Sequence, residues 1–263
     1  MSLLDYQSPP TAINSDYCFC KFFNNMDCLQ SCENLSLPNN VRPHCYESMF
    51  EGCKDLQILP SLPATSLKYM DGFIEKDAVA CYAYMFKNCT SLIYGSDLSL
   101  RVDNLVDYCY QGMFEGCEQL INTPHFYKPS SIGKYSCANM FNKCSALNDF
   151  TSLQFFSNTN LAEGCYMRML SGTAFNQPIS FYDVSTFPMY CCKSMFEDCK
   201  NLTVDPSFSI NSNLGPYCFE NMLRGCSKFN DLARLMDVFG TDKLAEGCYS
   251  GMLSGTSVTE VNS

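Results

Sequence analysis

A twelve-residue pattern that recurs along almost the whole chain limits the folds open to this sequence. Its clearest copy begins at Cys45. Counting that residue as position 0, it has Cys at 0, Tyr at 1, Met at 4, Phe at 5, Cys at 8 and Leu at 11. Internal repetition with a period of about 20–50 residues is typical of arrays in which each unit packs mainly on its neighbours. Nine copies, spaced by 26 to 36 residues, start at Cys18, Cys45, Cys81, Cys109, Ser136, Cys165, Cys191, Cys218 and Cys248.

The pattern predicts one short helix and one short strand in each repeat. At about 100° per residue of an α-helix, positions 0, 4, 8 and 11 share one face, and positions 1 and 5 widen it. Positions 0 to 7 are therefore expected to form a helix, which the Gly or Asn common at position 7 would end in the left-handed conformation. The segments that follow, such as residues 56–60 and 120–124, are partly β-branched and are stopped by proline, so we expect short strands there.

These elements together predict an α/β repeat solenoid of the leucine-rich-repeat type. Each repeat of about 27 residues would supply one short helix and one short parallel strand, with strands on one face and helices on the other. No linker rich in Pro, Ser or Gly interrupts the repeats. Residues 17–263 are therefore expected to form a single solenoid of about nine repeats, preceded by an N-terminal arm at residues 1–16.

The cysteines follow the repeat, which favours buried thiols over a disulfide framework. Of the 19 cysteines, 14 occupy position 0 or 8, in phase with the methionines, and an odd count leaves at least one thiol outside any intrachain pairing. Occasional disulfides remain the alternative. The predicted core of the regular repeats comprises Cys45, Met49, Phe50, Cys53, Cys81, Met85, Phe86, Cys89, Cys109, Met113, Phe114, Cys117, Met195, Phe196 and Cys199.

The first repeat carries extra cysteines that could indicate a metal site. Four thiols, at Cys18, Cys20, Cys28 and Cys32, match the ligand count of a structural zinc site. Their spacing lacks a Cys-x₂-Cys pair, and Cys18 already belongs to the repeat pattern. A thiol-rich N-terminal cap is therefore preferred to zinc, and we expect no metal and no cofactor anywhere in the chain.

The second repeat is nine residues longer than the first, and the excess lies within residues 66–77. Insertions in repeat arrays form loops on one face, which is often the binding face. This insertion mixes aromatic side chains with charges of both signs, a composition suited to contact with a partner. A surface loop without function is the alternative. The candidate partner-binding residues are Tyr69, Asp71, Phe73, Glu75 and Lys76.

The charge and hydropathy of the chain narrow the classes of partner. A formal net charge of −10 would be repelled by nucleic acid and by anionic membranes, so neither is expected as a partner. No apolar run approaches the roughly 18 residues of a membrane span, so no membrane insertion is expected. The N-terminus lacks the basic and apolar regions of a secretory signal peptide. This favours a chain that is made in the cytoplasm and is then kept there or released within a particle.

Sequence motifs for catalysis are missing, and the chain is not expected to be an enzyme. The common phosphate-binding, zinc-protease and nucleophile-elbow motifs do not occur. His44 and Cys45 are adjacent, but neighbours in sequence need not face each other and the repeat places Cys45 in the core. We predict no catalytic residue.

The repeats resemble a known family. Cys45-Tyr46 with Met49-Phe50-Glu51-Gly52-Cys53 and Leu56, and the run Leu161-Ala162-Glu163-Gly164-Cys165-Tyr166, are similar to BspA-like leucine-rich repeats of bacterial surface proteins. The resemblance covers more than 90% of the chain. It implies a right-handed coil, a cell-surface location, and a role in adhesion or protein recognition.

Two functions follow. The first is a non-enzymatic protein-interaction or adhesion module that presents a rigid solenoid surface to a protein or a cell-surface glycan. The alternative is an architectural or decoration subunit of a larger assembly, such as a phage head or tail appendage. Because no capping repeat follows the last copy, we also expect the C-terminal edge to be covered by the tail of the chain, by a second copy or by another assembly subunit. Partner contacts are expected where the repeat is interrupted: in the arm, in the insertion, and in repeats six and nine, which have Thr173 and Thr256 at position 8.

Overall fold

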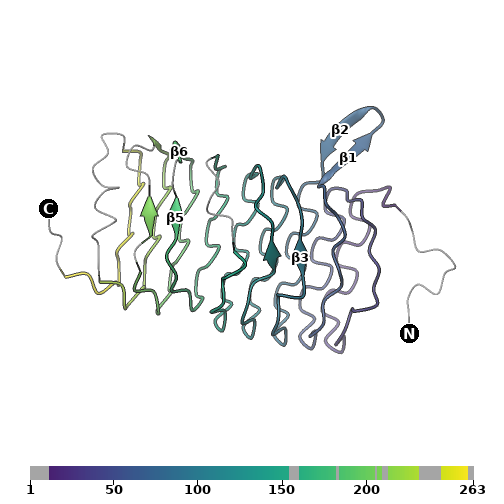
Figure 1. Ribbon diagram of the computed structural model, residues 1–263, viewed down its shortest axis with the longest axis horizontal. Coiled ribbons are helices and arrows are strands. Elements are labelled where there is room, and N and C mark those ends of the chain that lie inside the picture. The colour runs from purple at the N-terminus through teal and green to yellow at the C-terminus, as the bar shows by residue number, and fades with distance from the viewer. Residues whose placement is uncertain are drawn as a thin grey trace.

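The predicted α/β solenoid with a helix in every repeat is wrong. The computed structural model describes residues 12–153, 160–181, 184–204, 206–208, 213–230 and 244–259, and these ranges contain no helix and only eight short strands. Successive repeats lie side by side along the long axis of the molecule, with the N-terminal and C-terminal repeats at opposite ends (Figure 1). Most of the described chain is built from turns and irregular segments, joined from one repeat to the next by backbone hydrogen bonds.

In place of the helix, each repeat contains a run of overlapping turns. The N–H of every second residue closes a turn by donating to the carbonyl three residues earlier, as Met49 does to Tyr46 (3.2 Å). The N–H of each intervening residue donates to the next repeat, as Phe50 does to Met85 (2.9 Å). The carbonyls alternate in the same way. The run therefore satisfies its buried backbone groups without forming a helix or a sheet.

A left-handed residue at every fourth position shapes this run. In the second repeat these residues are His44, Ser48 and Gly52, with φ of 56°, 53° and 74°, and the same three positions have positive φ in the other repeats wherever they are described. Position 7 is left-handed, as expected, but no helix ends there. Side chains branched at Cβ are strained at positive φ, and Val, Ile and Thr occur at none of these positions.

A period of four also explains why the pattern was interpreted as a helix. Positions 0 and 1 are buried in the core, positions 2 and 3 are more variable in exposure, and positions 4 and 5 are buried again, as in Cys45-Tyr46 and Met49-Phe50. Over only two periods, a spacing of four residues differs little from the 3.6 residues of an α-helix. All fifteen side chains assigned to the repeat core are at most 1% exposed.

The core is arranged in columns that run from repeat to repeat. At position 5, Phe50, Phe86 and Phe114 stack with ring centroids 5.5 Å apart at both steps. At position 1, Tyr46 stacks in the same way on Tyr82, at 5.5 Å. Each column position packs mainly against its equivalents, so the pattern favours one register between repeats.

The cysteines at position 8 provide a hydrogen bond between repeats. The thiol of Cys89 donates to the carbonyl of Phe50 in the preceding repeat (3.2 Å), and the thiol of Cys117 donates to that of Phe86 (3.1 Å). That carbonyl also accepts the N–H at position 8 of its own repeat. In repeat six Thr173 replaces the cysteine, and its hydroxyl donates to Leu170 in the same repeat (2.8 Å). All 19 cysteines are free thiols.

The buried thiols predict that the fold loses stability at alkaline pH. Burial raises the pKa of Cys45, Cys199 and Cys218 to about 12, against 9.0 for an ordinary thiol. Above pH 9 the unfolded chain releases these protons while the folded chain keeps them, so stability is full below about pH 9 and falls as pH rises towards 12. The urea midpoint should therefore be lower at about pH 10 than at about pH 8 and should recover on return. An unchanged midpoint would contradict the prediction.

The strands are few, and one strand per repeat is not observed. Three parallel pairs have two-residue strands, and the described residues of 56–60 and 120–124 form only isolated bridges, such as that between Tyr94 and Asn122. The strands are β1 (Lys68–Asp71), β2 (Ile74–Asp77), β3 (Ser99–Leu100), β4 (His125–Phe126), β5 (Ser180–Phe181), β6 (Thr186–Phe187), β7 (Ser207–Phe208) and β8 (Asn213–Leu214), paired as β1–β2, β3–β4, β5–β7 and β6–β8.

The distinct start of repeats six and nine accommodates a tyrosine from the preceding repeat. The ring of Tyr135 lies over Gly164, where an added Cβ would meet ring atoms at 2.2 Å, and its hydroxyl donates to Glu163 (2.9 Å). Tyr217 has the same relation to Gly247. In these repeats the glycine leaves space for the tyrosine ring and the glutamate accepts its hydroxyl hydrogen bond, so the Glu-Gly pair has a structural role.

Candidate functional site

The insertion forms a β-hairpin that projects from the stack. Strands β1 and β2 pair antiparallel, with Tyr69 opposite Lys76 and Met70 opposite Glu75 (Figure 1). Gly72 and Phe73 connect them, and Gly72 has a φ of +64°, as a tight hairpin turn requires. The other three strand pairs are parallel, so the hairpin is a separate local structure added to the array.

Two ion pairs between the strands hold the hairpin flanks. Lys68 Nζ lies 2.8 Å from a carboxylate oxygen of Glu75, and Lys76 Nζ lies 2.5 Å from one of Asp71. Both pairs are exposed, so water screens their charges and each pair contributes little to stability. The four paired charges cancel one another, and Asp77 at the end of β2 leaves the hairpin with a net charge of −1.

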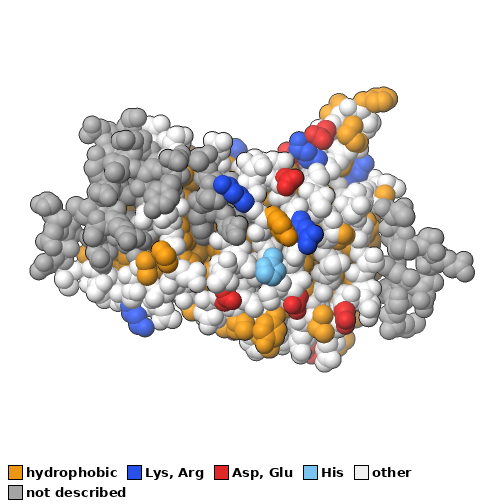
Figure 2. All heavy atoms as spheres, in the orientation of Figure 1, with side chains coloured by type: hydrophobic (Ala, Val, Ile, Leu, Met, Phe, Trp, Pro, Cys, Tyr) orange, Lys and Arg blue, Asp and Glu red, His pale blue; other side chains and the backbone are white. Residues whose placement is uncertain are grey.

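The tip of the hairpin is apolar and exposed. Phe73 is fully exposed, and Met70 and Ile74 are 57% and 63% exposed. Hydrophobic side chains gather at the end of this projection in Figure 2. Single exposed apolar side chains are common, but three together on a projecting turn are typical of a surface that another molecule covers. We call Met70, Phe73 and Ile74 the hairpin tip.

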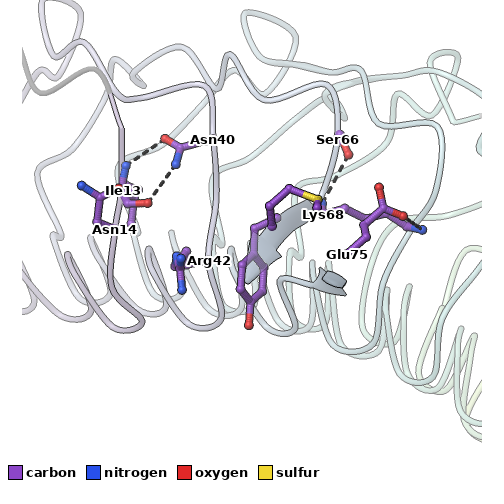
Figure 3. A pocket seen from close by; sticks show the side chains of 9 residues that line it. Ile13, Asn14, Asn40, Arg42, Ser66, Lys68 and Glu75 are labelled. Carbon is purple, nitrogen blue, oxygen red and sulfur yellow. Dashed lines mark hydrogen bonds and ion pairs between the residues drawn. The ribbon is translucent and has the colours of Figure 1, made fainter. Parts of the chain in front are cut away.

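The base of the hairpin is fixed to the stack by Tyr69 and adjoins a hollow of about 380 Å³. The guanidinium of Arg42 lies over the ring of Tyr69, 4.5 Å from its centroid. Asn40 closes the far side through two 2.9 Å hydrogen bonds with the backbone of Ile13 (Figure 3). The hollow is lined by Ile13, Asn14, Asn40, Arg42, Ser66, Lys68, Tyr69, Met70 and Glu75.

The structure places the five predicted partner-binding residues on this one hairpin but gives them different roles. Tyr69 contacts Arg42 at the base, and Phe73 lies at the tip. Asp71, Glu75 and Lys76 are engaged in the ion pairs of the flanks. Sequence reasoning missed Met70 and Ile74, although they flank the Gly-Phe turn in the sequence. It also missed Arg42, which precedes Tyr69 by about one repeat length and has no feature in the sequence that indicates the contact.

The weaker candidates for chemistry do not assemble into a site. His44 hydrogen bonds Glu47 (2.7 Å) and stacks on Tyr17, whereas Cys45 is fully buried and burial raises the pKa of its thiol to about 12. His44 and Cys45 therefore form no nucleophile pair. Of the four N-terminal thiols, Cys18 and Cys28 are exposed and Cys32 is buried. Within the part of the chain that the structure describes, no three His, Cys, Asp or Glu side chains gather to hold a metal ion.

Comparison with known proteins places the chain in a family. The sequence model of the family described as "Mycoplasma protein of unknown function, DUF285" matches residues 82–209 and 108–236, which together span more than half of the chain. The chain belongs to this family. The hairpin precedes both matched segments, so it lies outside the part that the family model describes. No curated protein and no solved structure matches the chain.

None of the described segments contains a helix that is both long and apolar enough to cross a membrane.

Proposed function

We propose that the chain is a protein-interaction or adhesion module that binds its partner through the hairpin tip. One observation carries the proposal: Met70, Phe73 and Ile74 expose apolar side chains around the turn at the end of a projection. A projecting tip can enter a concave surface of a partner, and a few side chains buried in this way contribute most of the energy of such contacts.

The stiffness of the hairpin supports this proposal. Four residues pair in each strand, two ion pairs brace the flanks, and Tyr69 fastens the base under Arg42. A tip that is already held in one shape loses little conformational freedom on binding, which favours affinity. Four of the five charges on the strands are paired with one another, so apolar contact should dominate recognition.

The resemblance of the repeats to BspA-like surface proteins supports the same function. Many members of that group act in adhesion or in recognition of other proteins. For this chain, we propose a protein partner rather than a glycan, since an exposed Phe flanked by Met and Ile offers few hydrogen-bonding groups for sugar hydroxyls.

Replacing Phe73 with serine should weaken partner capture without affecting the fold. The probe is a panel of purified matrix and cell-surface glycoproteins, tested by biolayer interferometry before and after enzymatic removal of their glycans. Wild-type chain should bind at least one panel protein in both forms, and Phe73→Ser should weaken that binding about ten-fold or more.

Tyr94→Ser provides the matched control, because Tyr94 is also exposed (53%) but lies outside the hairpin. This variant should bind like the wild type. Equal loss in both variants would exclude the hairpin as the binding surface. Loss of binding after glycan removal would identify a glycan as the ligand and contradict a protein partner.

A further inference from the structure

The backbone hydrogen bonds that join the turn runs of successive repeats have one direction. In each such interface, N–H groups of the earlier repeat donate to carbonyls of the later one. Phe19 donates to Cys45 (2.8 Å) at the first interface, and Asn221 donates to Ser250 (2.8 Å) at the last. The turn runs therefore have a donor side, which faces the C-terminal end of the stack, and an acceptor side, which faces the N-terminal end.

The two ends of the stack present complementary halves of this interface. In the last repeat, the N–H groups of Gly247, Gly251, Leu253 and Gly255 donate to no acceptor in the described part of the chain. In the first repeat, the carbonyls at the matching acceptor positions receive no donor from the described residues; they belong to Asp16, Cys20, Phe22 and Asn24. Exposed rows of unpaired backbone groups are templates for association with another chain.

We propose that the C-terminal end of one chain stacks on the N-terminal end of a second copy and continues the array. The N–H groups of Gly251, Leu253 and Gly255 donate to the carbonyls of Cys20, Phe22 and Asn24 of the second copy, at the spacing used inside the chain. This inference concerns a surface other than the hairpin and does not depend on the proposed function.

The side chains at the two ends fit such a junction. The left-handed positions of the last repeat are all glycine (Gly247, Gly251 and Gly255), whereas those of the first repeat carry side chains. A glycine followed by a side chain in the next repeat already occurs inside the stack, at Gly112 and Asn139, where the Gly112 N–H donates to Ala138 (2.8 Å). At the left-handed positions, the junction therefore needs no contact that the chain does not already make.

The apolar side chains of the first repeat also favour a covering copy. Phe22 and Met26 occupy positions 4 and 8, where Met49 and Cys53 of the second repeat are 1% and 0% exposed. Phe22 and Met26 are 55% and 43% exposed. Stacking of a second copy would bury both side chains, and burial of apolar surface drives association.

The residues at position 8 are matched at the two ends as well. Inside the stack, a thiol at position 8 donates to the carbonyl at position 5 of the preceding repeat, as Cys53 does to Phe23 (3.0 Å). Met26 has no such donor. The corresponding carbonyl at the other end, that of Leu253, already accepts the hydroxyl of Thr256 (2.9 Å). A junction between copies would therefore leave no carbonyl that needs a thiol.

Such a contact joins two different surfaces, so it can be extended by further copies. Each added copy would bring another hairpin to the same assembly, which would raise avidity for a partner that has several binding sites.

Concentration-dependent hydrogen exchange and mass test the proposal directly. As the chain concentration rises from low micromolar to submillimolar, analytical ultracentrifugation should show a series of dimers, trimers and larger species. Over the same range, amide exchange in residues 247–255 should slow, while exchange in a central repeat such as residues 109–117 should not change. A monomer at every concentration, or unchanged exchange in residues 247–255, would overturn the proposal.

Two single variants test whether the contact is head to tail. Phe22→Lys places a charge on the acceptor end, and Leu253→Lys places one on the donor end. Each variant alone should remain monomeric, and an equimolar mixture should form dimers and nothing larger, through the two unaltered ends. Dimers of either variant alone would indicate a symmetric contact and would overturn the proposal.

The hairpin variant Phe73→Ser is the control, and it should assemble like the wild type. Circular dichroism of each variant should match that of the wild type. If Leu253→Lys loses the last repeat, the exchange measurement on the wild-type chain decides the outcome.

Discussion

Phe86→Ala is expected to lower the free energy of unfolding by about 3–5 kcal/mol, as large truncations in packed cores do. Phe86 is fully buried and stacks on Phe50 and Phe114, so truncation leaves a cavity in the middle of the column. The surrounding turn runs are held on both sides by backbone hydrogen bonds and can close that cavity only partly. Urea denaturation followed by circular dichroism measures the loss.

Phe73→Ala is the matched control for this prediction. It makes the same chemical change at a fully exposed side chain, so unfolding should change by less than about 0.5 kcal/mol. Equal effects of the two variants would show that the phenylalanine column does not stabilise the stack. Because repeats interact mainly with their neighbours, the loss of stability should appear first in the repeats on either side of the one that contains Phe86.

Gly133→Ala is expected to destabilise the fold by about 1–3 kcal/mol through crowding between two repeats. A Cβ at Gly133 would lie 2.5 Å from the carbonyl carbon of Val106 and 2.6 Å from the nitrogen of Asp107. Both are backbone atoms of the preceding repeat, and neither can rotate away as a side chain could. The two repeats must therefore move apart locally, which weakens their hydrogen bonds.

Gly72→Ala separates crowding from backbone strain. At Gly72, φ is +64° and an added Cβ would meet nothing within 4 Å, so only the cost of a left-handed alanine applies, about 1 kcal/mol. That cost falls on the hairpin and should hardly affect unfolding of the stack. Thermal unfolding of both variants measures the difference, and a larger loss for Gly72→Ala would contradict the steric argument.

The sequence predicted the repeats and the buried positions, but not the backbone that connects them. The inward positions are the same for a helix and for turns of period four, since positions 0, 4 and 8 lie on one side in both. The left-handed residues distinguish the two, and glycine indicates them in only some repeats, as at Gly52, Gly116 and Gly225 of position 7. At positions −1 and 3 the same conformation is adopted by residues such as Tyr108 and Ser48, which give no such signal.

The hairpin could be located from the sequence but not described. Its excess length and composition marked residues 66–77 as an insertion on the surface. Two antiparallel strands were not foreseen, because Lys68–Asp71 and Ile74–Asp77 lack the alternation of apolar and polar residues that predicts a strand with one buried face. The contact between Arg42 and Tyr69 depends on how two repeats stack, which local sequence does not encode.

The alignment of the hydrogen bonds between repeats with the long axis of the molecule also determines how it responds to force. These bonds lie along the long axis, so tension applied to the two termini pulls directly on the end repeats (Figure 1). The interfaces are loaded in series and carry the same tension, so an end repeat, which is held by only one neighbour, should detach first. An optical-tweezers experiment should therefore record stepwise lengthening, one repeat per step. The chain would extend gradually under tension instead of unfolding in a single event.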